Sequence, residues 1–301
     1  MQAITHGENA SVHHAPDANA REAMLTALVD RWTEHMRWRK NFDRWREDRL
    51  WQEDGQMPRI RMIEREHGPN GGERVLDIGS GMGGFLVAAA RNAMNVVGLE
   101  PNADYCTITR LRGARYGLTP SVVRSVGETL PFSDHSFDVV LAQDILEHVR
   151  DPDSTLREMR RVVCPGGLAL VTVINRFAWR DPHYHLRGIN WLPRPLGEAI
   201  VERIGRSKRG ARFTDNQRLT EMYYDTFGGF AARVAGMGFV ATDMKESLLM
   251  QPTATGAKNA RHAALKRALR RCGLLRAAYR LHRCAVVSTF EVALRPVDVA
   301  R

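Results

Sequence analysis

The residues best suited to chemistry begin with one acid inside an apolar run. Asp77 lies between Leu76 and Ile78, and four glycines follow within six positions. A glycine has no Cβ and reaches positive φ freely, so a ligand can approach the backbone of such a turn closely. The helical run that starts at Phe85 would add unpaired N–H groups at its amino terminus. The segment Arg74–Phe85 therefore predicts a strand, a tight turn and a helix start that together bind a ligand.

Two cofactors fit a glycine turn of this kind. Gly79, Gly81 and Gly84 have the spacing of a dinucleotide site, in which the turn and the helix hold a pyrophosphate. Glu100 follows at about the distance expected for a ribose contact. S-adenosylmethionine carries no phosphate, but it has a cationic sulfonium and an amino-acid end. Because a carboxylate attracts a cation and repels a pyrophosphate, Asp77 favours S-adenosylmethionine.

A methyl group leaves a sulfonium by in-line displacement, and an oxygen acceptor of high pKa also needs a base. Asp144 and His148 follow the fourth predicted strand, and His183 and His185 follow the fifth. We expect the catalytic group among these four residues, with the two later histidines the stronger candidates. The same later histidines could instead belong to a packed surface loop, and Glu147 with His148 could simply begin a helix.

No metal ion is expected. Asp181, His183 and His185 could coordinate one, but sugar methyltransferases that use a divalent ion supply mainly carboxylates, which hard cations prefer. The four cysteines are scattered, with no CxxC pair and no metal-ligand spacing. Reduced thiols in a cytoplasmic protein are the plain interpretation, and residues 1–19 lack the features of a signal peptide.

Alternating strand and helix signals must position these residues. Strands are predicted at 74–78, 95–99, 121–126, 137–142, 168–174, 239–248 and 285–294, with helices at 83–91, 103–116 and 154–163. Strands separated by helices of this length pair in parallel, which predicts an α/β fold with a doubly wound, mainly parallel, seven-stranded sheet. In such sheets ligands bind at the carboxyl ends of the strands.

The remaining segments divide the chain around this sheet. We expect a flexible tail at 1–19, an N-terminal helical cap at 20–72 and the main domain at 73–301. An aromatic and histidine-rich insertion at about 175–230 should build the acceptor side, and a basic helical insertion at about 256–284 should interrupt a terminal hairpin. The tryptophans of the cap fit either packing on the core or a lid over a ligand.

Five motifs occur in the order that one family shows: Asp77-Ile-Gly-Ser-Gly-Met-Gly, Glu100-Pro-Asn, Leu130-Pro-Phe-Ser-Asp-His-Ser-Phe-Asp138, Leu146-Glu-His-Val and Arg161-Val-Val-Cys-Pro-Gly-Gly167. Over residues 74–174 the chain resembles class I S-adenosylmethionine-dependent methyltransferases, particularly the broad group that contains the ubiquinone and menaquinone methyltransferases. The resemblance implies a Rossmann-like methyltransferase fold, S-adenosylmethionine as cofactor and an enzyme that transfers a methyl group.

The resemblance also implies the cofactor contacts: Asp77, Gly79, Ser80, Gly81, Glu100, Pro101, Asn102, Gly127, Glu128 and Gln143. In this assignment Asp77 and the glycines lie against the methionine end, and Glu100 accepts hydrogen bonds from both ribose hydroxyls. Asn102 lies against the adenine edge, and Gln143 faces the methionine or sulfonium region.

One position departs from the family pattern. Related sequences often read Gly-Asp-Ala-Glu where this chain has Ser-Val-Gly-Glu, so Val126 replaces the aspartate that holds the adenine amino group. Adenine recognition should then depend on the backbone near Gly127 and on Glu128.

The positive charge of the chain is concentrated in one segment. The net charge is +10, and residues 258–283 contain nine Lys and Arg residues and no acid. The segment could lie on an anionic bilayer surface, could merely solubilise the protein, or could contact nucleic acid, which is the minor option. We expect a cytoplasmic protein, peripheral to the inner face of the membrane if the first option holds.

Residues 181–193 resemble insertions of methyltransferases from bacterial glycan and glycolipid pathways. With the five motifs, this resemblance implies O-methylation of a small-molecule, glycan or lipid-linked acceptor. The alternatives are N- or C-methylation of a small molecule, or a non-catalytic, membrane-associated protein that binds the cofactor. The sequence does not identify the acceptor or the oligomeric state.

Overall fold

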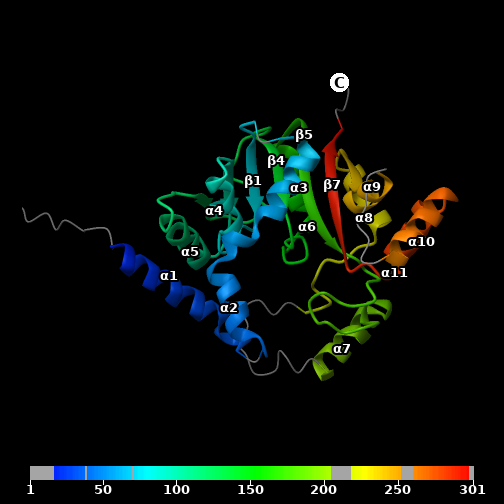
Figure 1. Cartoon of the computed structure of the whole chain (residues 1–301), viewed down its shortest axis with the longest axis horizontal. Coiled ribbons are helices and arrows are strands. Elements are labelled where there is room, and N and C mark those ends of the chain that lie inside the picture. Colours follow the sequence, from blue (N-terminus) through cyan, green and yellow to red (C-terminus); the bar gives the residue numbers. More distant parts are fainter. Residues whose placement is uncertain (1–16, 38, 70, 205–217, 252–259, 298–301) are drawn as a thin grey trace, which may run out of the picture.

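The computed structural model describes residues 17–37, 39–69, 71–204, 218–251 and 260–297. Parts of the predicted tail, insertion and basic segment, namely residues 1–16, 205–217 and 256–259, lie outside the described residues. A seven-stranded sheet runs through the centre of the molecule in the order β3-β2-β1-β4-β5-β7-β6 (Figure 1). Its strands are β1 (Arg74–Ile78), β2 (Asn95–Leu99), β3 (Ser121–Val123), β4 (Phe137–Ala142), β5 (Val163–Ile174), β6 (Phe239–Asp243) and β7 (Thr289–Pro296). The predicted doubly wound sheet is confirmed.

Helices cover both faces of the sheet and extend beyond its carboxyl edge (Figure 1). The α-helices are α1 (Ala18–Thr33), α2 (Phe42–Leu50), α3 (Met57–His67), α4 (Gly84–Arg91), α5 (Ala103–Ala114), α6 (Pro152–Val162), α7 (Arg194–Ile204), α8 (Phe227–Ala235), α9 (Met244–Met250), α10 (Ala260–Arg271) and α11 (Leu275–Ala285). Short 3₁₀ helices occur at η1 (Glu34–Met36), η2 (Gln52–Gly55) and η3 (Ile189–Trp191).

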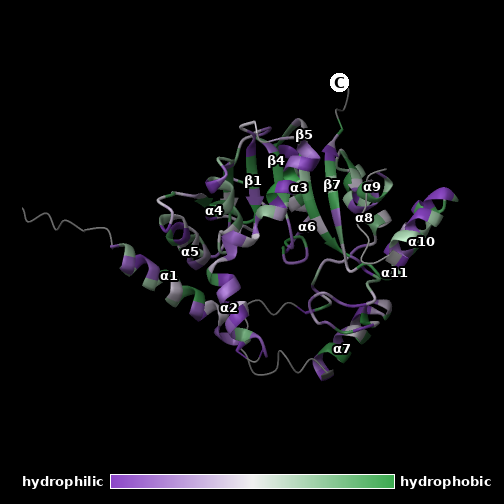
Figure 2. Ribbon diagram, viewed as in Figure 1, coloured by the Kyte–Doolittle hydropathy of each residue, from purple (hydrophilic) through white to green (hydrophobic). Residues whose placement is uncertain are grey.

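The central strands are buried on both faces because helices pack against each side of them. Leu76 and Val140 point into a core with residues of α6 and α8, whereas Val75, Val139 and Leu141 point into a core with residues of α3 and α4. Full burial of each such side chain contributes about 1.5–3 kcal/mol of transfer free energy. Figure 2 shows the result, with hydrophobic strands at the centre and hydrophilic surfaces on α1, α2 and α10. The well-packed sheet gives the loops at its carboxyl edge a rigid base.

The last two strands form the antiparallel pair that the sequence predicts, but three boundary predictions are wrong. The strand expected at 121–126 ends at Val123, and the one expected at 285–294 begins at Thr289, after α11 has ended at Ala285. The strand expected at 239–248 ends at Asp243, and α9 begins at the next residue. The Asp243 side chain accepts hydrogen bonds from the N–H groups of Lys245 and Glu246, which is N-cap geometry. The basic insertion between β6 and β7 contains two helices, α10 and α11, which meet at Gly273 with a φ of 69°.

The N-terminal helices are held to the sheet domain by a buried ion pair. Arg112 of α5 and Glu53 of η2 are both fully buried and bonded to each other, and Arg112 also donates to the carbonyl of Leu50 at 2.8 Å. Arg115 adds a second bond to Glu53 at 2.9 Å. α1 packs on α5, the helix that follows β2, whereas α3 packs against α4 and β5.

Candidate active site

A pocket of about 570 Å³ opens where β1, β2 and β4 end. The three strands are parallel and in register, with Asp77 of β1 paired to Gly98 of β2 and to Leu141 of β4, so their carboxyl ends lie level. The pocket is lined by Ile78, Gly79, Leu99, Glu100, Pro101, Val126, Gly127, Glu128, Ile145, His148, Val149 and Arg150. Its volume lies in the range of small-molecule and cofactor sites.

The glycine turn forms one wall of this pocket. The N–H groups of Gly79 and Ser80 both donate to the carbonyl of Leu99, at 2.7 and 3.0 Å, which fixes the turn against β2. Gly79 has a φ of 71°, and a Cβ at this position would lie 2.0 Å from Cδ1 of Ile145. Only glycine allows the turn and the segment after β4 to approach this closely. The Ser80 Oγ is buried beneath the turn without a hydrogen-bond partner.

Glu100 lies at the end of β2 and is the buried acid of the pocket, with 6% of its surface exposed. Its two carboxylate oxygens accept hydrogen bonds from the N–H groups of Gly81 and Asn102, both at 2.9 Å. A carboxylate can accept about four hydrogen bonds in all. This geometry suits a vicinal diol such as the hydroxyls of a ribose.

Asp77 is fully buried in β1 and forms an ion pair that the sequence did not suggest. Its carboxylate lies 2.5 Å from the guanidinium of Arg59, which comes from the first turn of α3 and stacks over the ring of Phe85. Burial raises the pKa of Asp77, and the charge of Arg59 opposes that rise. Neither residue of the pair lines the pocket, and Asp77 has no exposed surface, so the predicted contact of Asp77 with the cofactor is not seen in the pocket lining. The contact of Arg59 with Asp77 could not be predicted, because a single arginine in an N-terminal helix belongs to no sequence motif.

The far wall of the pocket contains the position where the family aspartate is replaced. Val126 lines the pocket and keeps 46% of its surface exposed, and Gly127 follows it. Glu128 also lines the pocket, and its Oε1 accepts the N–H of Arg150 at 2.8 Å. Asn102 is not among the lining residues, because its side chain caps α5 by accepting N–H bonds from Asp104 and Tyr105.

Two of the predicted histidines meet at the end of the pocket near β4. His148 lines the pocket, and its ring lies edge-on to that of His183 with centroids 5.2 Å apart. His183 Nε2 lies 3.7 Å from Oε1 of Glu147, whose side chain is almost fully buried. His185 lies outside this group with an exposed side chain and a φ of 57°. Burial and, to a smaller degree, Arg180 lower the pKa of His185.

Asp181 positions this end of the insertion. It is fully buried, and its Oδ1 accepts the N–H groups of His183 at 2.9 Å and Tyr184 at 2.7 Å. Its Oδ2 accepts bonds from Asn190 at 3.1 Å and from the hydroxyl of Tyr224 at 2.9 Å. All of these bonds hold the loop, so the carboxylate acts as a structural acceptor.

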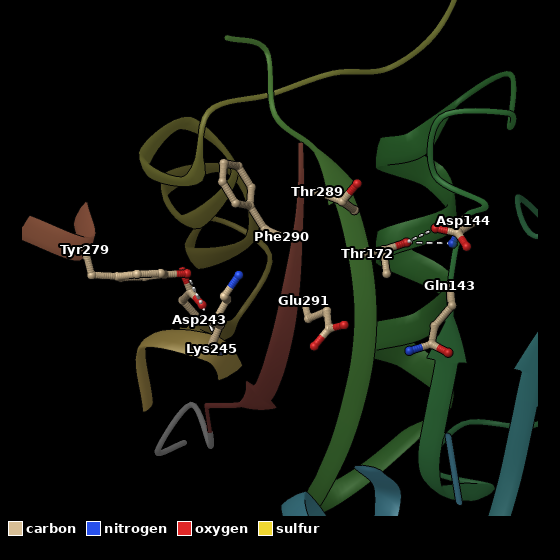
Figure 3. Close-up of a pocket in the computed structure, with 9 residues that line it drawn as sticks. All are labelled: Gln143, Asp144, Thr172, Asp243, Lys245, Tyr279, Thr289, Phe290 and Glu291. Atoms are coloured by element: carbon tan, nitrogen blue, oxygen red, sulfur yellow. Dashed lines mark hydrogen bonds between the residues drawn. The ribbon is translucent and has the colours of Figure 1, made fainter. Parts of the chain in front are cut away.

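Gln143 and Asp144 line a second pocket, of about 510 Å³, on the face of the sheet toward α9 (Figure 3). Gln143 Nε2 contacts the sulfur of Met62 at 3.4 Å. Thr172 accepts the N–H of Asp144 at 2.6 Å and donates to its carboxylate at 3.1 Å. The segment after β4 thus borders two cavities. Gln143 and Asp144 line the cavity of about 510 Å³, and not the one that Gly79 lines.

The comparison with known families identifies the domain. Residues 76–171 match the family described as "Methyltransferase domain". The chain contains a class I S-adenosylmethionine-dependent methyltransferase domain. Gly79, Glu100 and His148, which line the pocket of about 570 Å³, all lie within the matched residues.

Curated relatives carry methyltransferase names. An "uncharacterized methyltransferase" from Mycobacterium sp. (strain JLS) is 42% identical over 114 residues, which cover 37% of this chain and 42% of that protein. A ubiquinone biosynthesis O-methyltransferase from Brucella anthropi is 34% identical over 166 residues, or 50% of this chain and 65% of that protein. The chain thus spans less than two thirds of the length of these relatives. Among solved structures, an S-adenosylmethionine-dependent methyltransferase from Mesorhizobium loti is 18% identical with a TM-score of 0.49, covering 81% of this chain and 99% of that one.

Proposed function

We propose that this protein transfers a methyl group from S-adenosylmethionine to an oxygen of a small-molecule, glycan or lipid-linked acceptor. The observation that carries the proposal is the placement of His148 and His183 at the end of a pocket whose other walls are the glycine turn and Glu100. The name of the Brucella anthropi relative, an O-methyltransferase, supports oxygen as the acceptor atom.

The residues present fit this cofactor. The Glu100 carboxylate lines the pocket and is of the type that accepts hydrogen bonds from ribose hydroxyls. The uncharged side chain of Val126 leaves an apolar wall for the adenine. When bound, the cofactor supplies a methyl group activated by a sulfonium.

The histidines would then handle the acceptor. A neutral imidazole of His148 or His183 accepts the proton of the acceptor hydroxyl, which makes the oxygen a better nucleophile. The Glu147 carboxylate, 3.7 Å from His183, stabilises the imidazolium that forms.

The test is transfer of a radiolabelled methyl group to a cell extract, with wild-type protein, His148→Ala and His183→Ala. We expect the rate of methyl transfer to fall about 10²- to 10⁴-fold in at least one variant, which is the usual contribution of a general base. Affinity for S-adenosylhomocysteine should stay near the wild-type value. His282→Ala, which removes an exposed histidine of α11, is the control. A wild-type rate in both site variants would refute the assignment of a histidine as the general base. No transfer by the wild-type protein would point to a non-catalytic binding protein.

We also propose that α10 brings this cytoplasmic enzyme to the inner face of the membrane. Within the described part of the chain, no helix has the length and apolar character of a membrane span. The arginines of α11 are partly neutralised, because Arg276, Arg280 and Arg283 all contact Glu246. α10 instead exposes Leu265, and Arg261, one helical turn before it, and Arg267 are also exposed.

Liposome sedimentation tests this association. Wild-type protein should bind vesicles with anionic lipid, and salt should weaken that binding. Arg267→Glu should reduce binding, whereas Arg65→Glu on α3, another partly exposed arginine, should not. Equal binding to neutral vesicles would refute the electrostatic part of the proposal.

A further inference from the structure

Three potential metal ligands from two distant segments meet beside the cofactor pocket. Glu147 and His148 follow β4, and His183 comes from the insertion after β5. Each offers one ligand atom, and these atoms all lie within 4.8 Å of one another. Zinc–nitrogen and zinc–oxygen bonds of about 2.0–2.2 Å place two ligands up to about 4.2 Å apart across the ion. A shift of less than about 1 Å would therefore close the three atoms around one ion.

A second observation concerns one buried carboxylate oxygen of Glu147. Glu147 is only 2% exposed, and its Oε2 has no hydrogen-bond partner. A buried carboxylate without a partner is costly, and proteins normally supply a counter-charge or a metal ion. The nearest candidate is the imidazole of His183, whose Nε2 lies 3.7 Å from the other oxygen, Oε1, beyond hydrogen-bond distance.

The ligand chemistry selects the class of ion. Two imidazoles with one carboxylate suit zinc, iron, cobalt, nickel and manganese, whereas magnesium and calcium prefer a shell of oxygen ligands. Three protein ligands also leave at least one coordination position open, as in catalytic zinc sites. Because His148 lines the cofactor pocket, the open position would face the region where the acceptor binds.

We propose that Glu147, His148 and His183 form a site for a divalent transition-metal ion at the edge of the cofactor pocket. The site itself is independent of methyl transfer, but its role rests on the proposed function. With an ion bound, His148 and His183 would serve as ligands instead of bases. The ion would bind the acceptor oxygen and lower the pKa of its hydroxyl, and the proton would pass to solvent. The acceptors favoured would then be those with two adjacent oxygen donors, which can chelate the ion.

Direct metal binding tests the site. The full chain is stripped with chelator and titrated with Co²⁺, whose visible absorption reports coordination, and with Zn²⁺ in a calorimeter. Because the adjacent His13 and His14 could bind metal by themselves, the titrations use a background in which both are alanine. One ion per chain is expected. His183→Ala and Glu147→Gln should each weaken binding at least about tenfold, since loss of even an outer-shell partner costs that much. His282→Ala should not change it.

The outcomes separate this proposal from the proposed function. Co²⁺ binding that neither site variant weakens, or no binding by the wild-type background, overturns the metal site. Full methyl transfer by the stripped protein would refute the role of the ion at the acceptor and leave the proposed function intact. Site-specific Co²⁺ binding without any methyl transfer would support the metal site and count against the proposed function.

Discussion

Glu100 provides the sharpest test of the cofactor site, because both of its oxygens are already held by backbone N–H groups. Gly81 and Asn102 each donate to one oxygen at 2.9 Å. In Glu100→Gln one oxygen becomes an NH₂ group, which cannot accept from either N–H and cannot accept from a ribose hydroxyl. The variant therefore loses one acceptor for the ribose, and the remaining oxygen loses its charge.

The expected magnitude follows from the hydrogen bonds concerned. A bond to a charged group contributes about 1.5–3 kcal/mol, so one lost and one weakened bond should cost about 2–3 kcal/mol of binding free energy. That corresponds to an S-adenosylhomocysteine Kd about 30- to 150-fold higher, measured by calorimetry. The thermal midpoint should also fall, since the N–H left facing the new NH₂ is buried.

A ribose analogue separates this contact from a general disturbance of the pocket. Wild-type protein should bind 2′-deoxy- or 3′-deoxy-S-adenosylhomocysteine more weakly than the parent compound, and Glu100→Gln should discriminate much less in at least one of the two cases. Glu158→Gln is the matched control, because Glu158 also accepts a backbone N–H, from Leu130 at 2.7 Å, but outside the pocket. Unchanged discrimination in Glu100→Gln would refute the ribose assignment.

Three further predictions concern the scaffold around the site. Gly79→Ala should weaken cofactor binding more than Gly81→Ala, because both glycines have positive φ but only the first would place a Cβ against a side chain; calorimetry compares the two. Arg112→Met should lower the free energy of unfolding by about 3 kcal/mol in urea titrations, because it removes the main partner of the buried Glu53 carboxylate. Adding Glu53→Gln, which removes that charge, should recover some of the loss. Bonds from Arg74 hold the pKa of Asp138 below its usual range. Ionised Asp138 therefore stabilises the fold at pH values above its unfolded pKa, and this stabilisation is lost as the pH falls through the lower folded pKa. In Asp138→Asn the free energy of unfolding, measured by urea titration, should fall less between pH 6 and pH 3 than in the wild type.

The parts of the site that follow strands directly could be predicted from the sequence. The alternation of strands and helices fixed the sheet, and Glu100 and the glycine turn come immediately after strands whose carboxyl ends must meet. The boundaries that failed depend on local side-chain bonds instead. Asp243, for example, reads as part of a strand but ends it by capping α9.

Contacts between distant segments could not be predicted in the same way. Arg59 reaches Asp77 from a helix that the sequence marks only as part of a cap, and no spacing relates the two. Glu147 and His183 are likewise separated by α6, β5 and part of the loop after β5, and only the folded insertion brings them to 3.7 Å. Such pairs depend on tertiary packing, which periodicity and motifs do not encode.

Asp181 is a residue whose type suits catalysis or metal binding but whose bonds give it a structural role. By type and position it resembles a base or a metal ligand, yet its two oxygens accept four bonds, from His183, Tyr184, Asn190 and Tyr224. A carboxylate that is saturated in this way has little capacity left for a ligand. The same bonds fix the start of the insertion so that the ring of His183 lies beside His148. The glycine-turn wall of the pocket is therefore built by the sheet, whereas the histidine end depends on one buried aspartate that orders the insertion.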